Sequence, residues 1–127
     1  MDIRPIEAPD APGVQGSYSQ AVEVRGHERL LFVSGQIPET RSGEVPSHFD
    51  AQCRLVWRNV EAQLIAAGMT LDHLVKVTTY LSDRRWREAN GAIRREVLGT
   101  RRPALTVVVA DIYDEAWLLE IEVIAAA

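Results

Sequence analysis

Residues 75–81, with the sequence VKVTTYL, alternate apolar and polar side chains and are rich in β-branched residues. Successive side chains of a β-strand point to opposite faces, so this period of two predicts a strand with one face in the core. Segments with apolar residues at helical spacing lie on either side, at residues 49–67 and 83–98. We therefore expect a sheet strand whose sheet is covered by two helices.

Further from this strand lie four short segments rich in Val, Leu, Ile, Phe or Tyr, and each is predicted to be a strand: residues 18–24, 29–34, 104–110 and 117–126. The turn-like residues 25–28 predict that the first two strands form a β-hairpin. The element order predicts an α+β fold, a two-layer sandwich in which a mixed sheet of about five to six strands has both helices on one face.

The predicted helix ends rest on residues with known capping preferences. Ser47 is expected to be the N-cap of the first helix, and Gly68 suits the position just after its end. Ser82 or Asp83 is expected to cap the second helix, which ends near Gly99.

Length and composition indicate one ordinary globular domain over residues 1–127, with 46% hydrophobic and 25% charged residues. Fourteen basic and eighteen acidic residues give a net charge of −4, so no overall positive field attracts nucleic acid or anionic lipid. A single cysteine, Cys53, excludes an internal disulfide and fits a reducing cytosol, and no segment suits a signal peptide or a membrane span. We expect a cytoplasmic protein in which Cys53 is a buried, unreactive thiol.

The predicted sheet carries more apolar side chains than two helices can cover. The apolar side chains in question are Val22, Val33, Val77, Val107, Val109 and Ile121. Because a large bare apolar face is usually buried against another protein, this packing argument predicts a homo-oligomer.

Three classes of site lack support in the sequence. His27, His48 and His73 have neither metal-ligand spacing nor a cluster of acidic residues or cysteines around them, so no metal site is expected. There is no glycine-rich phosphate loop and no serine elbow.

Glu120 and Glu122 lie in phase within an apolar strand, so both project to the same face. A carboxylate beside apolar walls has a raised pKa and can transfer protons near neutral pH. A glutamate that faces water from an edge strand explains the pattern equally well.

Seven arginines form the one basic patch, namely Arg84, Arg85, Arg87, Arg94, Arg95, Arg101 and Arg102. RNA binding usually adds aromatic side chains to such a patch, and here only Trp86 is present, in the apolar stripe of the helix. We interpret the patch as a solvated helix face. Arg101 and Arg102 are the exceptions, because they flank the start of a strand and are expected to be able to reach an anionic ligand in a cleft.

Several motifs, taken in order, resemble those of the RidA/YjgF family, the reactive intermediate deaminases also called L-PSP endoribonuclease-like proteins. They are GSYSQA at 16–21, FVSGQIP at 32–38, Asn59-Val60, AAG at 66–68, VKVTTYL at 75–81, Asn90, RPA at 102–104 and LEIEVIA at 119–125. The resemblance implies a chorismate-mutase-like α+β homotrimer with small-molecule clefts between subunits. It also implies hydrolysis of enamines or imines to 2-oxo acids and ammonia without metal or cofactor.

Carried over by position, the resemblance implies a role for five residues of this cleft. Tyr18 and Asn90 would line it, Ser34 and Gly35 would border it, and Glu120 would serve the attacking water or the leaving nitrogen.

The chain departs from the family pattern after Pro103-Ala104, where deaminases of the family have an arginine that binds the substrate carboxylate. Here the residue is Leu105, and a charge-assisted contact of this kind is worth about 1.5–3 kcal/mol. Leu105 and Val107, with Trp117 as a further candidate, would form an apolar wall that favours a neutral or aromatic ligand. Whether Arg101 or Arg102 replaces the missing arginine stays open.

Three functions follow, in this order. The first is hydrolysis of an enamine or imine, with Glu120 as acid and base and with 2-iminopropanoate disfavoured because Leu105 replaces the anchoring arginine. The second is non-catalytic binding of a small ligand, in a regulatory role. Endoribonuclease activity ranks last, and nucleic acid is not an expected partner.

Overall fold

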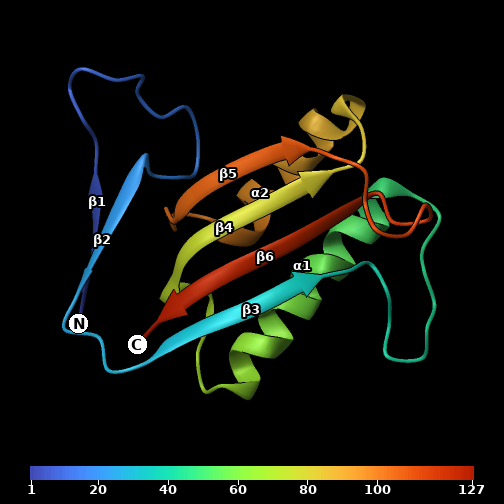
Figure 1. The fold of residues 1–127 in the computed structure, drawn as a ribbon, viewed down its shortest axis with the longest axis horizontal. Coiled ribbons are helices and arrows are strands. Elements are labelled where there is room, and N and C mark those ends of the chain that lie inside the picture. Colours follow the sequence, from blue (N-terminus) through green and yellow to red (C-terminus); the bar gives the residue numbers. More distant parts are fainter.

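The computed structural model describes residues 1–127 and contains six strands and two α-helices (Figure 1). The strands are β1 (Asp2–Ile6), β2 (Ala21–Arg25), β3 (Leu30–Gln36), β4 (Leu74–Leu81), β5 (Ala104–Val109) and β6 (Leu119–Ala126). The helices are α1 (Phe49–Ala66) and α2 (Arg87–Leu98), and short 3₁₀ turns η1 (Leu71–His73) and η2 (Arg84–Trp86) precede β4 and α2. The predicted α+β class is confirmed.

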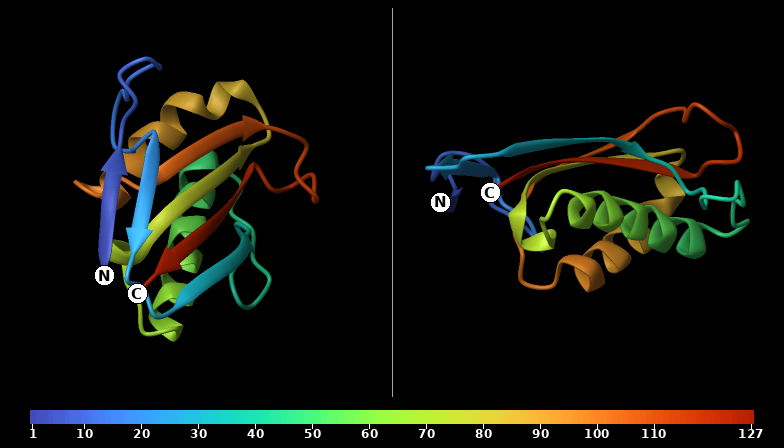
Figure 2. Two further views of the ribbon diagram at one scale, coloured as in Figure 1. Left: turned by 60° about the vertical axis from the view of Figure 1, so that its left-hand side comes forward. Right: turned by 90° about the horizontal axis from the view of Figure 1, so that it is seen from below.

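The main sheet has the strand order β3-β6-β4-β5. Strands β4 and β5 are parallel, while β6 is antiparallel to both of its neighbours, so the sheet is mixed. Both helices lie against the same face of this sheet, as the view along the layers in Figure 2 shows. The predicted two-layer arrangement is therefore confirmed.

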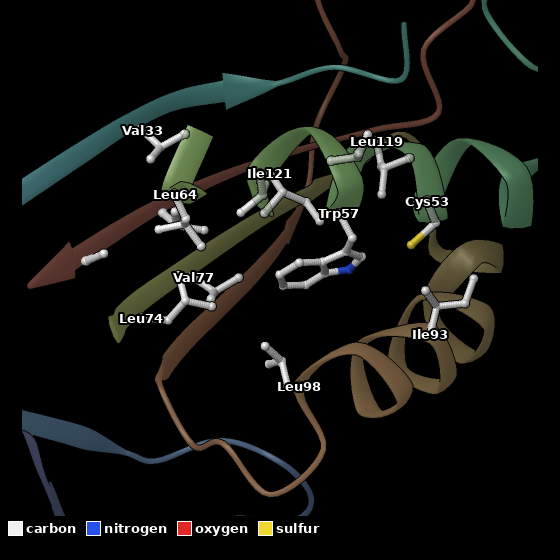
Figure 3. Packing of buried hydrophobic residues seen from close by; sticks show 14 of the residues in the cluster. Val33, Cys53, Trp57, Leu64, Leu74, Val77, Ile93, Leu98, Leu119 and Ile121 are labelled. Atoms are coloured by element: carbon white, nitrogen blue, oxygen red, sulfur yellow. The ribbon is translucent and has the colours of Figure 1, made fainter. Parts of the chain in front are cut away.

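The core lies between α1 and the helix-facing side of β4 and β6 (Figure 3). Side chains from successive turns of α1 meet alternate side chains of the strands, and each is at most 2% exposed: Cys53, Val56, Trp57, Val60, Leu64, Val77 and Ile121. Burying a large apolar side chain contributes about 1.5–3 kcal/mol, so this layer supplies much of the stability. The predicted burial of Cys53 is confirmed, and burial also raises the pKa of its thiol to about 12.

The helix ends match the sequence in part. Helix α1 ends in a Schellman motif: Gly68 has φ 72°, its N–H donates to the carbonyl of Ile65 and that of Met69 to the carbonyl of Leu64. The N-cap prediction is wrong, because His48 holds that position and the Ser47 hydroxyl is hydrogen-bonded to His48 Nδ1 at 2.8 Å.

The cap of the second helical segment is Asp83. It accepts the Arg85 N–H, and so caps turn η2 directly ahead of α2.

The predicted hairpin between the second and third strands is wrong. Strand β2 pairs with β1 in a separate two-stranded ribbon beside the main sheet (Figure 1). After Gly26 the chain joins the end of β6 instead, since the N–H groups of Glu28 and Arg29 both donate to the carbonyl of Ala127. Strand β1 was not predicted, because residues 2–6 contain few apolar side chains and include Arg4 and Pro5, so they show no strand pattern in the sequence.

The packing argument for a bare apolar face is also wrong. Val33, Val77 and Ile121 all lie in the buried core, and Val22 belongs to the separate ribbon. Val107 and Val109 also point to the helix side, but β5 is an edge strand and the helices leave them 39% and 48% exposed. The outer face is mixed in polarity, with Phe32, Tyr80 and Glu122 among its residues. No helix is long and apolar enough to cross a membrane.

Candidate functional site

A cavity of about 790 Å³ opens between α2, β5 and the segment before β2. Four of the predicted site residues line it together: Tyr18, Asn90, Leu105 and Val107. The other residues of its wall are Gln15, Gln20, Leu81, Arg84, Arg87, Glu88, Gly91, Arg94, Arg95 and Val109. The structure thus places four of the seven predicted site residues in one recess.

The β5 residues reach this cavity because of the strand register. Leu105 and Val107 are the parallel partners of Val77 and Thr79, which are buried under the helices. Paired residues point to the same face, so Leu105 and Val107 face the helix side, at the edge that α2 leaves open.

Helix α2 and the segment before β2 supply the opposite walls. Asn90 and Arg94 are four residues apart on α2 and share one helix face. Tyr18 is held in place through Ser19, whose N–H donates to the carbonyl of Pro103 at 3.0 Å and whose hydroxyl donates to the carbonyl of Arg102 at 2.6 Å.

The cavity is strongly basic, since four arginines and only one acidic residue line it. The interpretation of the arginine patch as a solvated face is wrong for Arg94, whose exposed fraction is 8%. Its buried Nε atom has no hydrogen-bond partner. Burial lowers the pKa of its guanidinium, and the neighbouring charge of Arg95 lowers it further.

Neither arginine at the start of β5 enters this cavity. Arg101 pairs with Asp72 at 2.7 Å, and Arg102 borders a smaller recess of about 180 Å³. Leu105 and Val107 do line the cavity as an apolar wall, whereas Trp117 does not. A different arginine, Arg94, which was not among the predicted site residues, shares the cavity with Leu105.

The remaining predicted residues, Ser34, Gly35 and Glu120, lie on the other side of the sheet. Glu120 is the cross-strand partner of Tyr80, in the set of residues that alternates with the buried ones. Ser34 and Gly35 lie where the register of β3 and β6 shifts, between Val33 and Gln36. A Cβ atom on residue 35 would overlap the Glu120 carboxylate, so only glycine lets that side chain lie against β3.

Partial burial raises the pKa of Glu120, and the charge of Glu122 raises it further. The Tyr80 hydroxyl donates to Glu122 Oε1 at 2.6 Å, and this bond raises the pKa of Tyr80. Tyr80 was not predicted as a site residue, although its place in the polar phase of VKVTTYL puts it on the face of the two glutamates. A groove of about 280 Å³ runs beside this group, with Ser34, Lys76, Thr78 and Glu122 in its wall.

The predicted site is therefore divided between two faces of one sheet. The basic cavity holds Tyr18, Asn90, Leu105 and Val107, and the acidic outer face holds Glu120 with Ser34 and Gly35. The thickness of the sheet separates Glu120 from Leu105 within a single chain. No group of three or more His, Cys, Asp or Glu side chains that could hold a metal ion is present.

Comparisons with known proteins agree with the motifs. The family model described as Endoribonuclease L-PSP matches residues 8–127. The RutC family protein PH0854 of Pyrococcus horikoshii is 36% identical over 118 residues, which are 91% of this chain and 91% of that protein. The conserved Rid family protein YyfB of Yersinia pestis, whose function is unknown, has a crystal structure that matches with a TM-score of 0.87 at 27% identity, covering 100% of both chains.

TdcF of Escherichia coli carries the provisional name reactive intermediate deaminase and is 38% identical over 79 residues, 61% of this chain and 59% of that protein. Its crystal structure with bound serine matches with a TM-score of 0.72 at 30% identity, over 98% of each chain. The family model spans nearly the whole chain and the fold agrees throughout, so the chain belongs to the RidA/YjgF family of endoribonuclease L-PSP-like proteins.

Proposed function

We propose that the protein hydrolyses a small imine or enamine, with Glu120 as the group that transfers protons. The observation that carries this proposal is the setting of Glu120, a partly buried carboxyl group with a raised pKa that lies against Gly35 beside a second acid. A carboxyl group with a pKa closer to neutrality both accepts and returns protons efficiently. The relationship to TdcF, whose provisional name is reactive intermediate deaminase, supports the same reaction class.

The reaction asks for little beyond positioning and one proton carrier. A protonated imine carbon is already electrophilic, and an enamine becomes an imine by protonation at carbon. The Glu120 carboxylate takes a proton from water as the water oxygen bonds to that carbon. The same proton then goes to the nitrogen, and the C–N bond breaks with its electron pair leaving on nitrogen. As the C=O bond forms, the hydroxyl proton passes to the Glu120 carboxylate, and ammonia and a carbonyl compound remain.

We propose that the cleft forms between two copies of the chain, because the predicted site residues of one copy are divided between two faces of its sheet. The basic cavity of one copy, with Tyr18 and Asn90, would face the acidic outer side of another copy, with Glu120. Opposite charges on the two surfaces favour this pairing over contact between like surfaces. We propose the closed homotrimer that the resemblance implies, which would give three equivalent clefts.

Hydrolysis is tested with a panel of imines generated in situ by an amino acid oxidase, in competition with semicarbazide as a trap. The wild-type protein should accelerate the loss of at least one imine. Glu120→Gln should lower that rate about 10²–10⁴-fold, the usual worth of a positioned acid or base. Glu115→Gln, at an exposed loop glutamate, is the matched control. Absence of acceleration across the panel, or full activity of Glu120→Gln, would contradict the proposal.

A second candidate function is non-catalytic binding of a small ligand, and Leu105 is the observation that favours it. Leu105 lines the cavity at the position where family deaminases carry an arginine, so the cleft can persist without its original substrate. Binding of a ligand without turnover by any panel imine would identify this case.

A further inference from the structure

The cavity between α2 and β5 contains a buried cation without a counter-charge. Arg94 is 8% exposed and takes part in none of the ion pairs of the structure. Its Nε atom is buried without a hydrogen-bond partner, and its side chain lines the cavity. We propose that Arg94 is the anion anchor of this cavity and binds the carboxylate of the ligand, from the helix side of the recess that Leu105 leaves open.

The first reason is the cost of burying a charge. A guanidinium removed from water is tolerated when an anion supplies the lost interactions. Two arginines elsewhere in the chain form close ion pairs, Arg54 with Glu96 and Arg101 with Asp72, both at 2.7 Å. Arg94 forms no ion pair within the chain and lines the cavity, so an anion bound there would supply the missing counter-charge.

The second reason is the composition of the wall around Arg94. Asn90 lies one helical turn away on the same face and can bind a second polar atom of the ligand. Leu105 and Val107 line the same recess from β5. Apolar walls exclude water and strengthen the attraction between a guanidinium and a carboxylate. The change to leucine at residue 105 thus helps an ion pair on Arg94.

The third reason concerns the class of ligand. The cavity of about 790 Å³ is within the range of typical small-molecule sites and exceeds the needs of a three-carbon acid. Its exposed arginines, Arg84, Arg87 and Arg95, attract anions toward the opening. The ligand that fits these features is a carboxylate with an apolar or aromatic substituent, such as an aromatic 2-oxo acid or its imine. This identification of the substrate class rests on the proposed function, whereas binding of the anion does not.

Binding is tested by calorimetry on the intact protein with benzoate and benzamide, which have similar shapes and differ in charge. Wild-type protein should bind benzoate and discriminate against benzamide by about tenfold to a hundredfold, the worth of a charge-assisted contact. Arg94→Met should abolish that discrimination and Arg94→Lys should retain part of it. Arg58→Met, at an exposed arginine of α1 that does not line the cavity, should change the affinity less than about threefold, because its charge is distant from the site and screened by solvent.

A second measurement separates ligand binding from a structural role. Because Met keeps the apolar stem and removes an unpaired buried charge, Arg94→Met should unfold at the same or a higher temperature than wild type without ligand. Benzoate should raise the unfolding temperature of wild type and not of the variant. A lower unfolding temperature for ligand-free Arg94→Met would show that Arg94 stabilises the protein without a ligand, through packing or through a carboxylate of another copy, and would overturn the proposal.

Other outcomes overturn it as well: no benzoate binding by wild type, equal binding of benzamide, or unchanged benzoate affinity in Arg94→Met. The proposed hydrolysis is tested independently, since Glu120→Gln should lose turnover. If Glu120→Gln loses turnover while Arg94→Met keeps its benzoate affinity, the anchor is disproved and the hydrolase stands. If wild type binds benzoate selectively through Arg94 and turns over no imine, the anchor stands and the hydrolase is disproved.

Discussion

Glu120 lies against Gly35 across strands β6 and β3, so closely that a methyl group at residue 35 would overlap its carboxylate. The shift in register between Val33 and Gln36 brings the glycine to this place. The pair therefore links a local irregularity of β3 to the position of Glu120, the proposed proton-transfer group, and it explains why glycine is needed at residue 35 although its φ is not positive.

Gly35→Ala should reduce hydrolysis because the added methyl group displaces the Glu120 carboxylate. We expect kcat/KM to fall by at least about tenfold, since small misplacements of a reacting group are costly. Overpacking of this kind costs about 1–3 kcal/mol of stability, so the variant should remain folded. Steady-state kinetics and thermal unfolding measure the two effects. Gly13→Ala, which meets only the end of the Glu7 side chain, is the control, and equal kinetics of the two variants would refute the link.

The raised pKa of Glu120 predicts how activity depends on pH. Burial and the charge of Glu122 hold the pKa above the ordinary value of 4.5, so the acidic limb of the rate profile should lie above that pH. Glu122→Gln removes one of the two causes and should move this limb to lower pH. The measurement is log(kcat/KM) against pH for both proteins, and a limb that does not move would exclude Glu120 as its origin.

The same shift has a consequence for stability. A carboxyl group with a higher pKa in the folded than in the unfolded state binds more protons when folded, so its contribution to stability falls as pH rises through that interval. Glu120→Gln has no such proton to lose. The difference in unfolding free energy between wild type and the variant should therefore change most just above pH 4.5 and level off at higher pH. Urea unfolding across this range gives the comparison, and a constant difference would contradict it.

Cys53 should resist modification as long as the protein is folded. The side chain is fully buried and its pKa is raised to about 12, so almost no thiolate is present at pH 8. We expect iodoacetamide to label the thiol at the rate of global or local unfolding. Mass spectrometry with and without denaturant measures that rate, and rapid labelling of the folded protein would show that α1 opens readily.

Some parts of the fold that depend on residues close together in the sequence were predicted correctly. The alternation in residues 75–81 and the glycine after α1 depend on neighbouring residues, and both were confirmed. The hairpin failed because the alternative partner of residues 28 and 29 is the carbonyl of Ala127, about a hundred residues away along the chain. Contacts at such separation leave no mark in a short window of sequence.

The family motifs predicted which residues belong to the candidate site, but not how those residues are arranged in space. Motif positions identified Tyr18, Asn90 and Leu105 as residues of one cleft, and they do share a cavity. Which alternate side chains of a strand face the helices depends on the register of strand pairing. The separation of Glu120 from that cavity therefore became clear only from the pairing of β4 with β5 and β6. Arg94 was missed because arginine on a helix is usually solvated, and only the packing of α2 against the sheet buries it.

Leu105→Arg tests whether the apolar wall sets substrate choice. The new guanidinium would share the cavity with Arg94, at the position where the family resemblance implies an arginine. We expect kcat/KM for 2-iminopropanoate to rise by about tenfold or more, the worth of one charge-assisted contact. The same change should lower kcat/KM for an aromatic imine, because a charged side chain replaces the wall against which the ring packs.

The ratio of the two kcat/KM values isolates this effect from any loss of folded protein. Val108→Arg, on the outer side of the same strand, adds an equal charge outside the cavity and should leave the ratio unchanged. If Leu105→Arg lowers both rates equally, residue 105 supports the cavity without selecting its occupant. If the variant hydrolyses 2-iminopropanoate and wild type hydrolyses nothing, the catalytic groups are intact and the leucine is what distinguishes a binding protein from a deaminase.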